Sequence, residues 1–343
     1  MCRTIMTGLV VAGVVLAVAG LAEAGNRGKV LNEQEIKKIT DAMPAKGPAT
    51  PVKPRKILVY SKCTGFYHGS IPYGNKAFEI MGAKTGAFQA VVSDDLSNFE
   101  ADKLKQFDAI IVNNCTGELL LPRAPRKPRA PNAKRIKDPA RLRQAQERYK
   151  KQLAEWEEQA AKLRAMPKDK AEQLRKNLMD WIKAGHGVIG VHAATDCSYQ
   201  WKEYGAMIGG YFTGHPWGGG STITLKVDDP AHPLNAAFGG EGVTFKEEIY
   251  QFARGVYSRQ KQRVLLSIDL SKTNKAGGCK RKDDDYAVSW VKKHGQGRVF
   301  YCSLGHNNHI FSNPKILRHY LAGIQWALGD LTGVDTTPNP LGK

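Results

Sequence analysis

The sequence predicts an α/β fold, with a parallel sheet covered by helices on both faces, a second half richer in β-structure, and a long basic helical insertion. Three observations predict it. In the first half, short apolar runs typical of buried strands alternate with amphipathic helical segments, which is the pattern of a parallel sheet. Past residue 220, runs with strand alternation follow one another without long helices between them. One segment between the two halves carries most of the excess positive charge.

The first half alternates strand and helix. Lys56–Tyr60 is a buried-strand run, and the helix predicted at about Gly74–Lys84 places Ala77 and Met81 on one face. The same alternation then predicts a strand, a short helix and a second strand, at Phe88–Val92, Glu100–Lys105 and Ala109–Asn113.

The segment Asp138–Ala184 is predicted to be helical, with a break near Pro167. Its first part is charged nearly all round, as in an exposed helix, whereas Leu174, Leu178 and Ile182 form an apolar stripe that should pack on the sheet. The predicted elements after it are a helix, five strands and a closing amphipathic helix, at Trp201–Ile208, Ser221–Val227, Val243–Phe252, Val264–Asp269, Ala287–Lys292, Arg298–Cys302 and Pro314–Leu328.

The N-terminus has the pattern of a Sec signal peptide over residues 1–24. The apolar run Gly8–Leu21 is short for a membrane span, and Ala22-Glu23-Ala24 is a small-residue cleavage signal. We therefore expect an exported protein, periplasmic or extracellular, with no membrane span after cleavage; an uncleaved anchor is the alternative. The rest divides into an arm or linker with a short helix at Glu33–Asp41, a main domain and a C-terminal tail, at 25–54, 55–330 and 331–343.

The formal net charge of +19 belongs mainly to the insertion, residues 122–176, which holds 18 Lys and Arg against 7 Asp and Glu. Such a segment could bind polyanions, but charge runs commonly stay solvated. Its central part has only two aromatic residues, Tyr149 and Trp156, which are few for a surface that stacks nucleic-acid bases. Nucleic acid is therefore not an expected partner.

Five cysteines remain after signal cleavage, scattered and without a CxxC pair, which excludes a disulfide scaffold or a zinc ribbon. Cys63 and Cys115 each follow a predicted parallel strand. A disulfide between them in an exported protein is left open.

Two strands each deliver a histidine at their carboxyl end. The run Gly187–Asp196 is an apolar strand with a tight turn at His192, and Gly297–Asn307 repeats the pattern with His306. The carboxyl ends of such strands open into the ligand crevice of α/β folds, so the two imidazoles should meet there. Imidazole at this position indicates a metal ligand or general base rather than a Ser or Cys nucleophile.

Several separate motifs, in order, resemble the ThuA-like family, which is named for trehalose utilisation and belongs to the class I glutamine amidotransferase-like, flavodoxin-like folds. The motifs that carry the resemblance lie between about Lys56 and Leu328, with the insertion outside it. They are Thr64–Ile71, Gly187–Asp196, Tyr211–Pro216, Asp229–Leu234, Lys246–Tyr250, and Trp290 with Gly295–His306. An amidotransferase would have Cys where this chain has His192, so glutamine hydrolysis is not expected.

The expected site combines three imidazoles and a carboxylate. His192, His215, His306 and Glu248 are a suitable ligand set for one divalent metal, Zn, Mn, Fe or Ni, with an open position for substrate. For catalysis we expect His192, His306 and Glu248 with Tyr250, a histidine as base and Tyr250 or His306 as acid. Substrate contacts are assigned to His68, Asp196, Trp217 and Asn307. Each has a structural alternative, such as a loop hydrogen bond, a helix cap or a place in the core.

The resemblance implies an exported enzyme of carbohydrate catabolism acting on oxidised (3-keto) glycosides such as 3-keto-trehalose, by isomerisation, elimination or hydrolysis. It implies work beside a sugar 3-dehydrogenase, on a small carbohydrate substrate, and no nucleotide cofactor. The alternatives are a non-catalytic sugar-binding protein and a polyanion-binding surface protein that uses the insertion. The sequence does not determine the oligomeric state.

Overall fold

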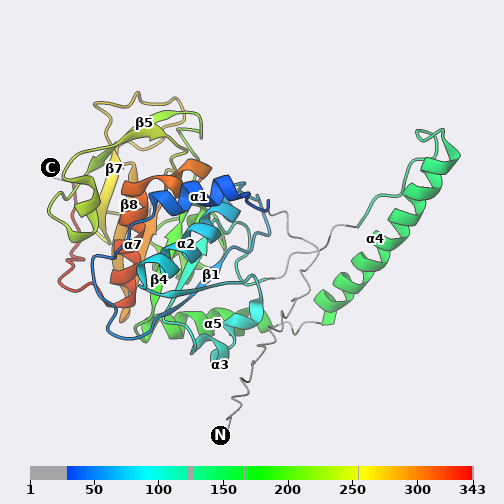
Figure 1. The fold of residues 1–343 in the computed structure, drawn as a ribbon, viewed down its shortest axis with the longest axis horizontal. Coiled ribbons are helices and arrows are strands. Elements are labelled where there is room, and N and C mark those ends of the chain that lie inside the picture. Colours follow the sequence, from blue (N-terminus) through cyan, green and yellow to red (C-terminus); the bar gives the residue numbers. More distant parts are fainter. Residues whose placement is uncertain are drawn as a thin grey trace, which may run out of the picture.

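The computed structural model describes residues 29–121, 125, 127–165, 167, 169–253 and 255–341. The predicted signal peptide, residues 1–24, lies outside them. Nine strands form one sheet in the order β2-β1-β3-β4-β9-β8-β7-β5-β6 (Figure 1). The fold is therefore the expected α/β architecture, with a parallel part that continues into an antiparallel part.

The parallel half contains the strands that deliver the candidate site residues. Their burial is nearly complete, because helices cover both faces of the sheet. All five were predicted, within one residue at each end, and they are β1 (Lys56–Tyr60), β2 (Gln89–Val92), β3 (Ala109–Asn113), β4 (Gly187–Val191) and β9 (Gly297–Cys302). Since β4 pairs with β9 in parallel register, Val191 opposite Cys302, both chains leave the sheet at the same edge.

The antiparallel half extends the sheet beyond β9. Its four strands are β8 (Ala287–His294), β7 (Arg263–Ile268), β5 (Thr222–Val227) and β6 (Thr244–Lys246). This is the predicted β-rich second half.

Two apolar layers cover the sheet. One contains α1 (Glu33–Ala42), α2 (Ile71–Thr85) and α7 (Pro314–Leu328); the other contains α3 (Ala101–Leu104), α5 (Lys170–Lys183) and α6 (Lys202–Ile208). Leu174, Leu178 and Ile182 of α5 are buried, as their stripe predicts. Short 3₁₀ helices complete the elements: η1 (Leu96–Phe99), η2 (His192–Thr195), η3 (Pro233–Phe238) and η4 (Asn308–Ser312).

The segment expected to be an arm or linker contains part of the packed core. Asn32 begins α1 with a capping box that Glu35 completes. Ile39 and Met43 are 1% and 3% exposed and belong to the core layer of α2 and α7. Lys84 donates to the carbonyls of Thr40 and Met43. The helix therefore docks on α2 instead of linking two units.

The insertion contains the long α4 (Pro139–Ala165), followed by α5, as the break near Pro167 predicts. Figure 1 shows α4 standing away from the sheet. The segment before the helix lies against it, since Trp156 Nε1 donates to the carbonyl oxygen of Pro125 at 3.0 Å.

The predicted strand Val243–Phe252 is wrong after Lys246. Only Thr244–Lys246 pairs with β5; beyond it the chain makes isolated bridges, Ile249 to Trp217 and Phe252 to Phe212. The change has a physical cause, because Glu247 turns its carboxylate to buried backbone amides of another loop.

Cys63 and Cys115 do not form the disulfide that the sequence left open. The Cys63 thiol donates to the carbonyl oxygen of Asn114 at 3.1 Å, and the Cys115 thiol to that of Tyr60 at 3.4 Å. Within the described residues, no helix has the length and apolar character that crossing a membrane requires.

His319 of α7 predicts a pH dependence of stability. Its ring is buried between the carbonyl oxygen of Leu234 (2.8 Å) and Ser289 Oγ (2.9 Å), and burial lowers its pKa from 6.5 to about 4. As the pH falls, His319 is therefore protonated in the unfolded chain before it is protonated in the folded protein. The free energy of unfolding falls as pH drops from 6.5 towards 4, by about 3 kcal/mol in total.

Denaturant unfolding of the parent and His319→Gln at several pH values between 7 and 4 measures this contribution. The variant should show a shallower loss of unfolding free energy across that window. Parallel pH profiles for the two proteins would contradict the assignment.

Candidate functional site

His192 leaves the sheet in an unusual backbone conformation. It follows β4 directly, with φ of 45°, in the left-handed region that non-glycine residues seldom adopt. The side chain is fully buried, and Nδ1 lies 2.6 Å from the carbonyl oxygen of Ser303. A carbonyl only accepts, so Nδ1 carries the proton and the Nε2 lone pair faces the site.

A buried carboxylate shapes the loop that carries His306. Glu247 accepts hydrogen bonds from three consecutive backbone N–H groups, those of Gly305 (3.1 Å), His306 (2.6 Å) and Asn307 (3.1 Å). Burial raises the pKa of Glu247 to about 7, although the three N–H donors oppose that shift. The contacts fix the chain after β9, and with it the position of the His306 ring.

His68 reaches the same place from the loop after β1. It is 3% exposed, and its ring meets those of His192 and His306 edge-on, at centroid distances of 4.9 and 5.4 Å. Ser70 Oγ donates to the carbonyl oxygen of Gly305 at 2.6 Å, which ties this loop to the His306 loop.

Glu248 is the carboxylate that the imidazoles surround. Oε1 lies 3.5 Å from His192 Nε2 and 3.2 Å from His306 Nδ1. One ligand atom each from His68, His192, Glu248 and His306 lies within 4.8 Å of the other three. Four chain segments that are distant in sequence therefore converge on one small volume.

The nitrogens that face this volume lack hydrogen-bond partners. His68 Nδ1, His192 Nε2 and His306 Nδ1 are buried, and none makes a hydrogen bond of good geometry. Buried polar atoms are normally paired, since leaving one unpaired costs about 1–3 kcal/mol. Nitrogen lone pairs around a carboxylate form a donor set for a divalent cation, and the residues present fit such an ion.

The electrostatics favour the proton-free state of three of the four groups, His68, His192 and Glu248, whereas His306 favours its protonated form. Burial lowers the pKa of His192, and lowers that of His68 to about 2, so both rings are neutral near pH 7. Burial alone would raise the pKa of Glu248, but its contacts with His192 and His306 hold it well below the usual value. The contact with Glu248 raises the pKa of His306.

His215, expected as a ligand, lies outside the cluster. Its Nδ1 is 3.8 Å from the other oxygen of Glu248, and its side chain is 55% exposed. His68, expected as a substrate contact, lies within the cluster. The loop after β1 reaches the centre because the carboxyl end of β1 lies at the same edge of the sheet as those of β4 and β9. The same reasoning from strand ends that predicted His192 and His306 could therefore have predicted His68.

The other expected residues divide between the site and the core. The Tyr250 ring lies 4.2 Å from that of His192, and burial raises its pKa well above the usual value. Asp196 accepts from Tyr199 Oη, and burial raises its pKa. Asn307 Nδ2 donates to the carbonyls of Gly219 and Lys246, a structural role.

Trp217 is a core residue rather than a substrate platform. It is 3% exposed, packs edge-on against Tyr286 and donates to the carbonyl oxygen of Asn274. Glu247 is the functional residue that the sequence did not single out. The sequence shows two adjacent glutamates, Glu247 and Glu248, but it does not show that the first accepts hydrogen bonds from the backbone of a distant loop.

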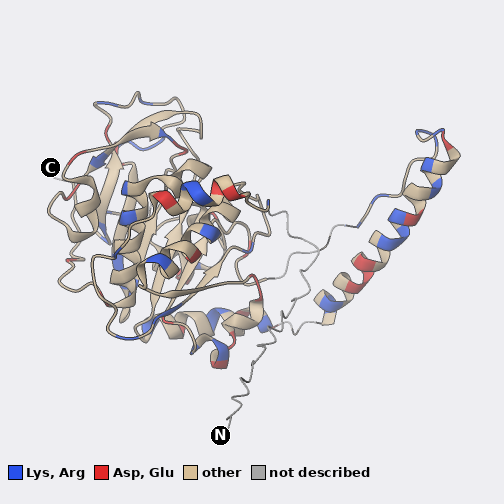
Figure 2. Cartoon of the chain, viewed as in Figure 1, with Lys and Arg blue, Asp and Glu red and all other residues tan. Residues whose placement is uncertain are grey.

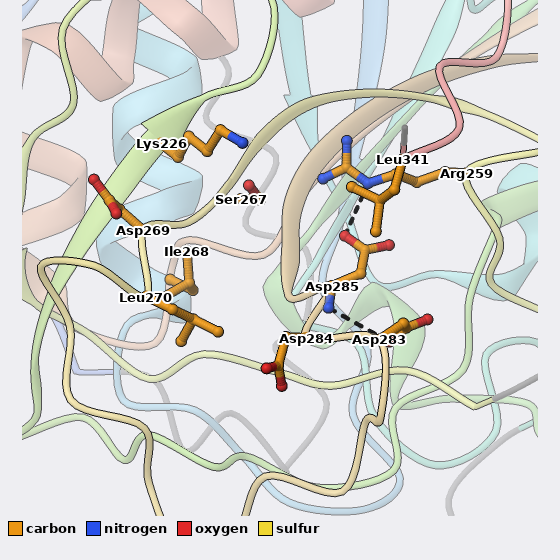
Figure 3. Close-up of a pocket in the computed structure, with 10 residues that line it drawn as sticks. All are labelled: Lys226, Arg259, Ser267, Ile268, Asp269, Leu270, Asp283, Asp284, Asp285 and Leu341. Atoms are coloured by element: carbon orange, nitrogen blue, oxygen red, sulfur yellow. Dashed lines mark hydrogen bonds and ion pairs between the residues drawn. The ribbon is translucent and has the colours of Figure 1, made fainter. Parts of the chain in front are cut away.

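A separate cavity lies in the antiparallel half (Figure 3). Its volume is about 230 Å³, and Arg259 and Asp285 on its wall form an ion pair of 2.9 Å. None of its lining residues belongs to the histidine cluster, and Arg259 is also paired with Asp228 at 3.0 Å, so its charge is already compensated within the fold. The histidine cluster is therefore the candidate functional site.

Comparison with known protein families gives a match over most of the chain. The ThuA family model, described as trehalose utilisation, matches residues 56–127 and 161–327. The chain belongs to the ThuA family. The part of the insertion outside the match contains nearly all of α4. Among curated proteins, no match was found.

Solved structures agree with the ThuA fold. A ThuA-like protein from Bacteroides uniformis is 17% identical, with a TM-score of 0.53, over 82% of this chain and 94% of its own. A ThuA-like protein from Parabacteroides merdae is 15% identical, with a TM-score of 0.48, over 82% and 92%. At these identities the first likeness supports the fold alone.

The cluster predicts which residues of this ThuA protein bind metal. Titration calorimetry of the metal-stripped protein with Zn²⁺ should give one site. His68→Ala and Glu248→Gln should each weaken binding about 100-fold, because each removes a ligand from a preformed set.

His309 offers a matched control, since it is an exposed histidine outside the cluster. His309→Ala should leave the affinity unchanged within about twofold, and His215→Ala should have a smaller effect than His68→Ala. A larger loss in His215→Ala than in His68→Ala would restore the ligand set expected from sequence.

Glu247 should be required for both stability and metal affinity. Glu247→Ala leaves three backbone N–H groups without their acceptor, which should lower the unfolding free energy by about 3 kcal/mol. The looser His306 loop should weaken Zn²⁺ binding as well. Glu241→Ala, an exposed carboxylate near the same segment, is the control for unfolding and calorimetry. A Glu247→Ala protein as stable as the control would overturn this role.

Proposed function

We propose that this ThuA protein is an exported enzyme of carbohydrate catabolism that acts on oxidised (3-keto) glycosides, such as 3-keto-trehalose, at the histidine cluster. The family is described by trehalose utilisation, which supports a carbohydrate substrate. The observation that carries the proposal is the group of unpaired imidazole nitrogens around Glu248. Isomerisation, elimination and hydrolysis of such sugars all begin with removal of a proton beside the ketone.

His68, His192, Glu248 and His306 would hold one divalent ion. Such an ion polarises a carbonyl oxygen and stabilises negative charge that develops on it. The hydrogen bond from Nδ1 to Ser303 keeps His192 in the tautomer that presents Nε2, and Glu247 keeps the His306 loop in place.

We assign proton transfer to two further residues. His215 is half-exposed and borders the carboxylate from outside, so its ring can accept a proton from a bound substrate. Tyr250 retains its phenolic proton, because burial raises its pKa, and can donate it beside His192.

An aromatic ring beside the cluster supports a sugar substrate. Phe66 is 64% exposed, unusual for a large apolar side chain, and its ring meets that of His68 at a centroid distance of 4.8 Å. An exposed ring at the edge of a polar centre suits the apolar face of a pyranose. A pathway partner that oxidises the sugar, a 3-dehydrogenase, would supply the substrate.

Export is proposed from the signal-peptide pattern of residues 1–24. N-terminal sequencing of the protein from its native host should begin at Gly25, in a periplasmic or extracellular fraction.

The activity can be tested in deuterated water by NMR, with 3-keto-trehalose and Zn²⁺, Mn²⁺, Fe²⁺ or Ni²⁺. We expect deuterium at the carbon beside the ketone, or a new keto-sugar product. His192→Ala should lower the rate about 100-fold or more with little effect on folding, and His309→Ala should retain it. Saturable sugar binding without exchange or product would instead support the non-catalytic sugar-binding alternative.

A further inference from the structure

The projecting part of the insertion is an ordered finger, defined here as residues 127–165. Asp138 Oδ1 accepts from the backbone N–H of Ala140 at 2.8 Å and caps α4. Lys127 lies over the Trp156 ring at 5.2 Å from its centroid, beside the bond from Trp156 to Pro125. The segment is therefore held against the helix at Trp156 and returns to its start at Asp138.

Charge is distributed unevenly along this finger. Residues 127–151, its distal half, carry ten Lys and Arg against two Asp and Glu, and all ten basic residues are exposed. One of the two acids, Asp138, is engaged as the helix cap. The half nearer the sheet, residues 152–165, has three Glu against Lys162 and Arg164. Figure 2 shows Lys and Arg gathered towards the far end and acidic residues nearer the body.

This separation differs from an ordinary solvated helix. Such helices mix charge signs and pair them at i,i+4, as Lys162 does with Glu158 at 2.8 Å. In the distal half, Arg141 Nε lies 3.8 Å from Asp138 Oδ2, but ten basic residues share two acids, so like charges repel one another and a bound polyanion would relieve that repulsion.

The geometry selects among polyanions. None of the exposed large apolar residues of the described chain lies in the finger, so it presents no exposed apolar face to a membrane. Tyr149 and Trp156 are half-buried, which leaves no platform for stacking bases. A B-DNA major groove, about 12 Å wide, accommodates a single helix, whereas at Trp156 the finger is a helix with a second segment against it.

We propose that the distal half of the finger binds an acidic polysaccharide, one that carries repeated carboxylate or sulfate groups, and so holds the enzyme domain close to a carbohydrate matrix. Such chains meet scattered Lys and Arg with many weak contacts and need no apolar pocket. The interaction is independent of the histidine cluster.

The test uses the full chain with polygalacturonate and heparin as probes, across a range of salt concentrations. One variant changes six distal basic residues to Gln: Lys134, Arg135, Lys137, Arg141, Arg143 and Arg148. Its matched control changes six exposed lysines of the rest of the domain to Gln: Lys38, Lys46, Lys105, Lys202, Lys280 and Lys282. A third variant changes only the four arginines among these six to Lys and so keeps the charge.

The distal variant should lose at least about tenfold in affinity near 0.15 M salt and show a shallower salt dependence. The control and the Lys-for-Arg variant should stay within about threefold of the parent, with all circular dichroism spectra alike. Equal losses in the distal and control variants would overturn the proposal, because net charge alone would then explain binding. Equal or tighter binding to duplex DNA or to phosphatidylglycerol vesicles would overturn the choice of polysaccharide.

Discussion

The centre depends on one hydrogen bond, between His192 Nδ1 and the carbonyl oxygen of Ser303. It joins the ends of two paired strands, β4 and β9, and determines which of the two imidazole nitrogens carries the proton. With Nδ1 as donor, Nε2 presents a lone pair to Glu248, so that His192 and its carboxylate neighbour form part of a buried donor set that fits a divalent cation. The left-handed backbone of His192 is retained at a cost, because a relaxed strand end would turn the ring away.

The sheet explains why these groups meet. Parallel strands bring their carboxyl ends to one edge, so loops after β1, β4 and β9 contribute His68, His192 and His306. The fourth group, Glu248, comes from the antiparallel half, where the chain leaves the ladder after β6. The two halves therefore supply different chemistry, imidazoles from one and the carboxylate from the other. Neither half alone contains the complete set.

The sequence predicts the sheet and most helices well, because strand runs and amphipathic stripes depend on local spacing. It predicts His192, His306 and Glu248 as neighbours, since strand ends and family motifs point to them. It misplaces His215 and Trp217, because a histidine or tryptophan in a loop has no periodicity that shows which way the side chain turns. The sequence does not predict the role of Glu247 or the end of β6 for a related reason. Their conformation depends on backbone amides about sixty residues further along the chain.

Adjacent residues in an extended chain point to opposite sides, and Glu247 and Glu248 use both directions. The first side chain holds the backbone that carries His306, and the second enters the histidine cluster. A displacement of this one segment would therefore remove a carboxylate and release an imidazole in a single movement. The carboxylate and the His306 loop are therefore coupled through two neighbouring side chains, whereas His192 is fixed separately by its bond to Ser303.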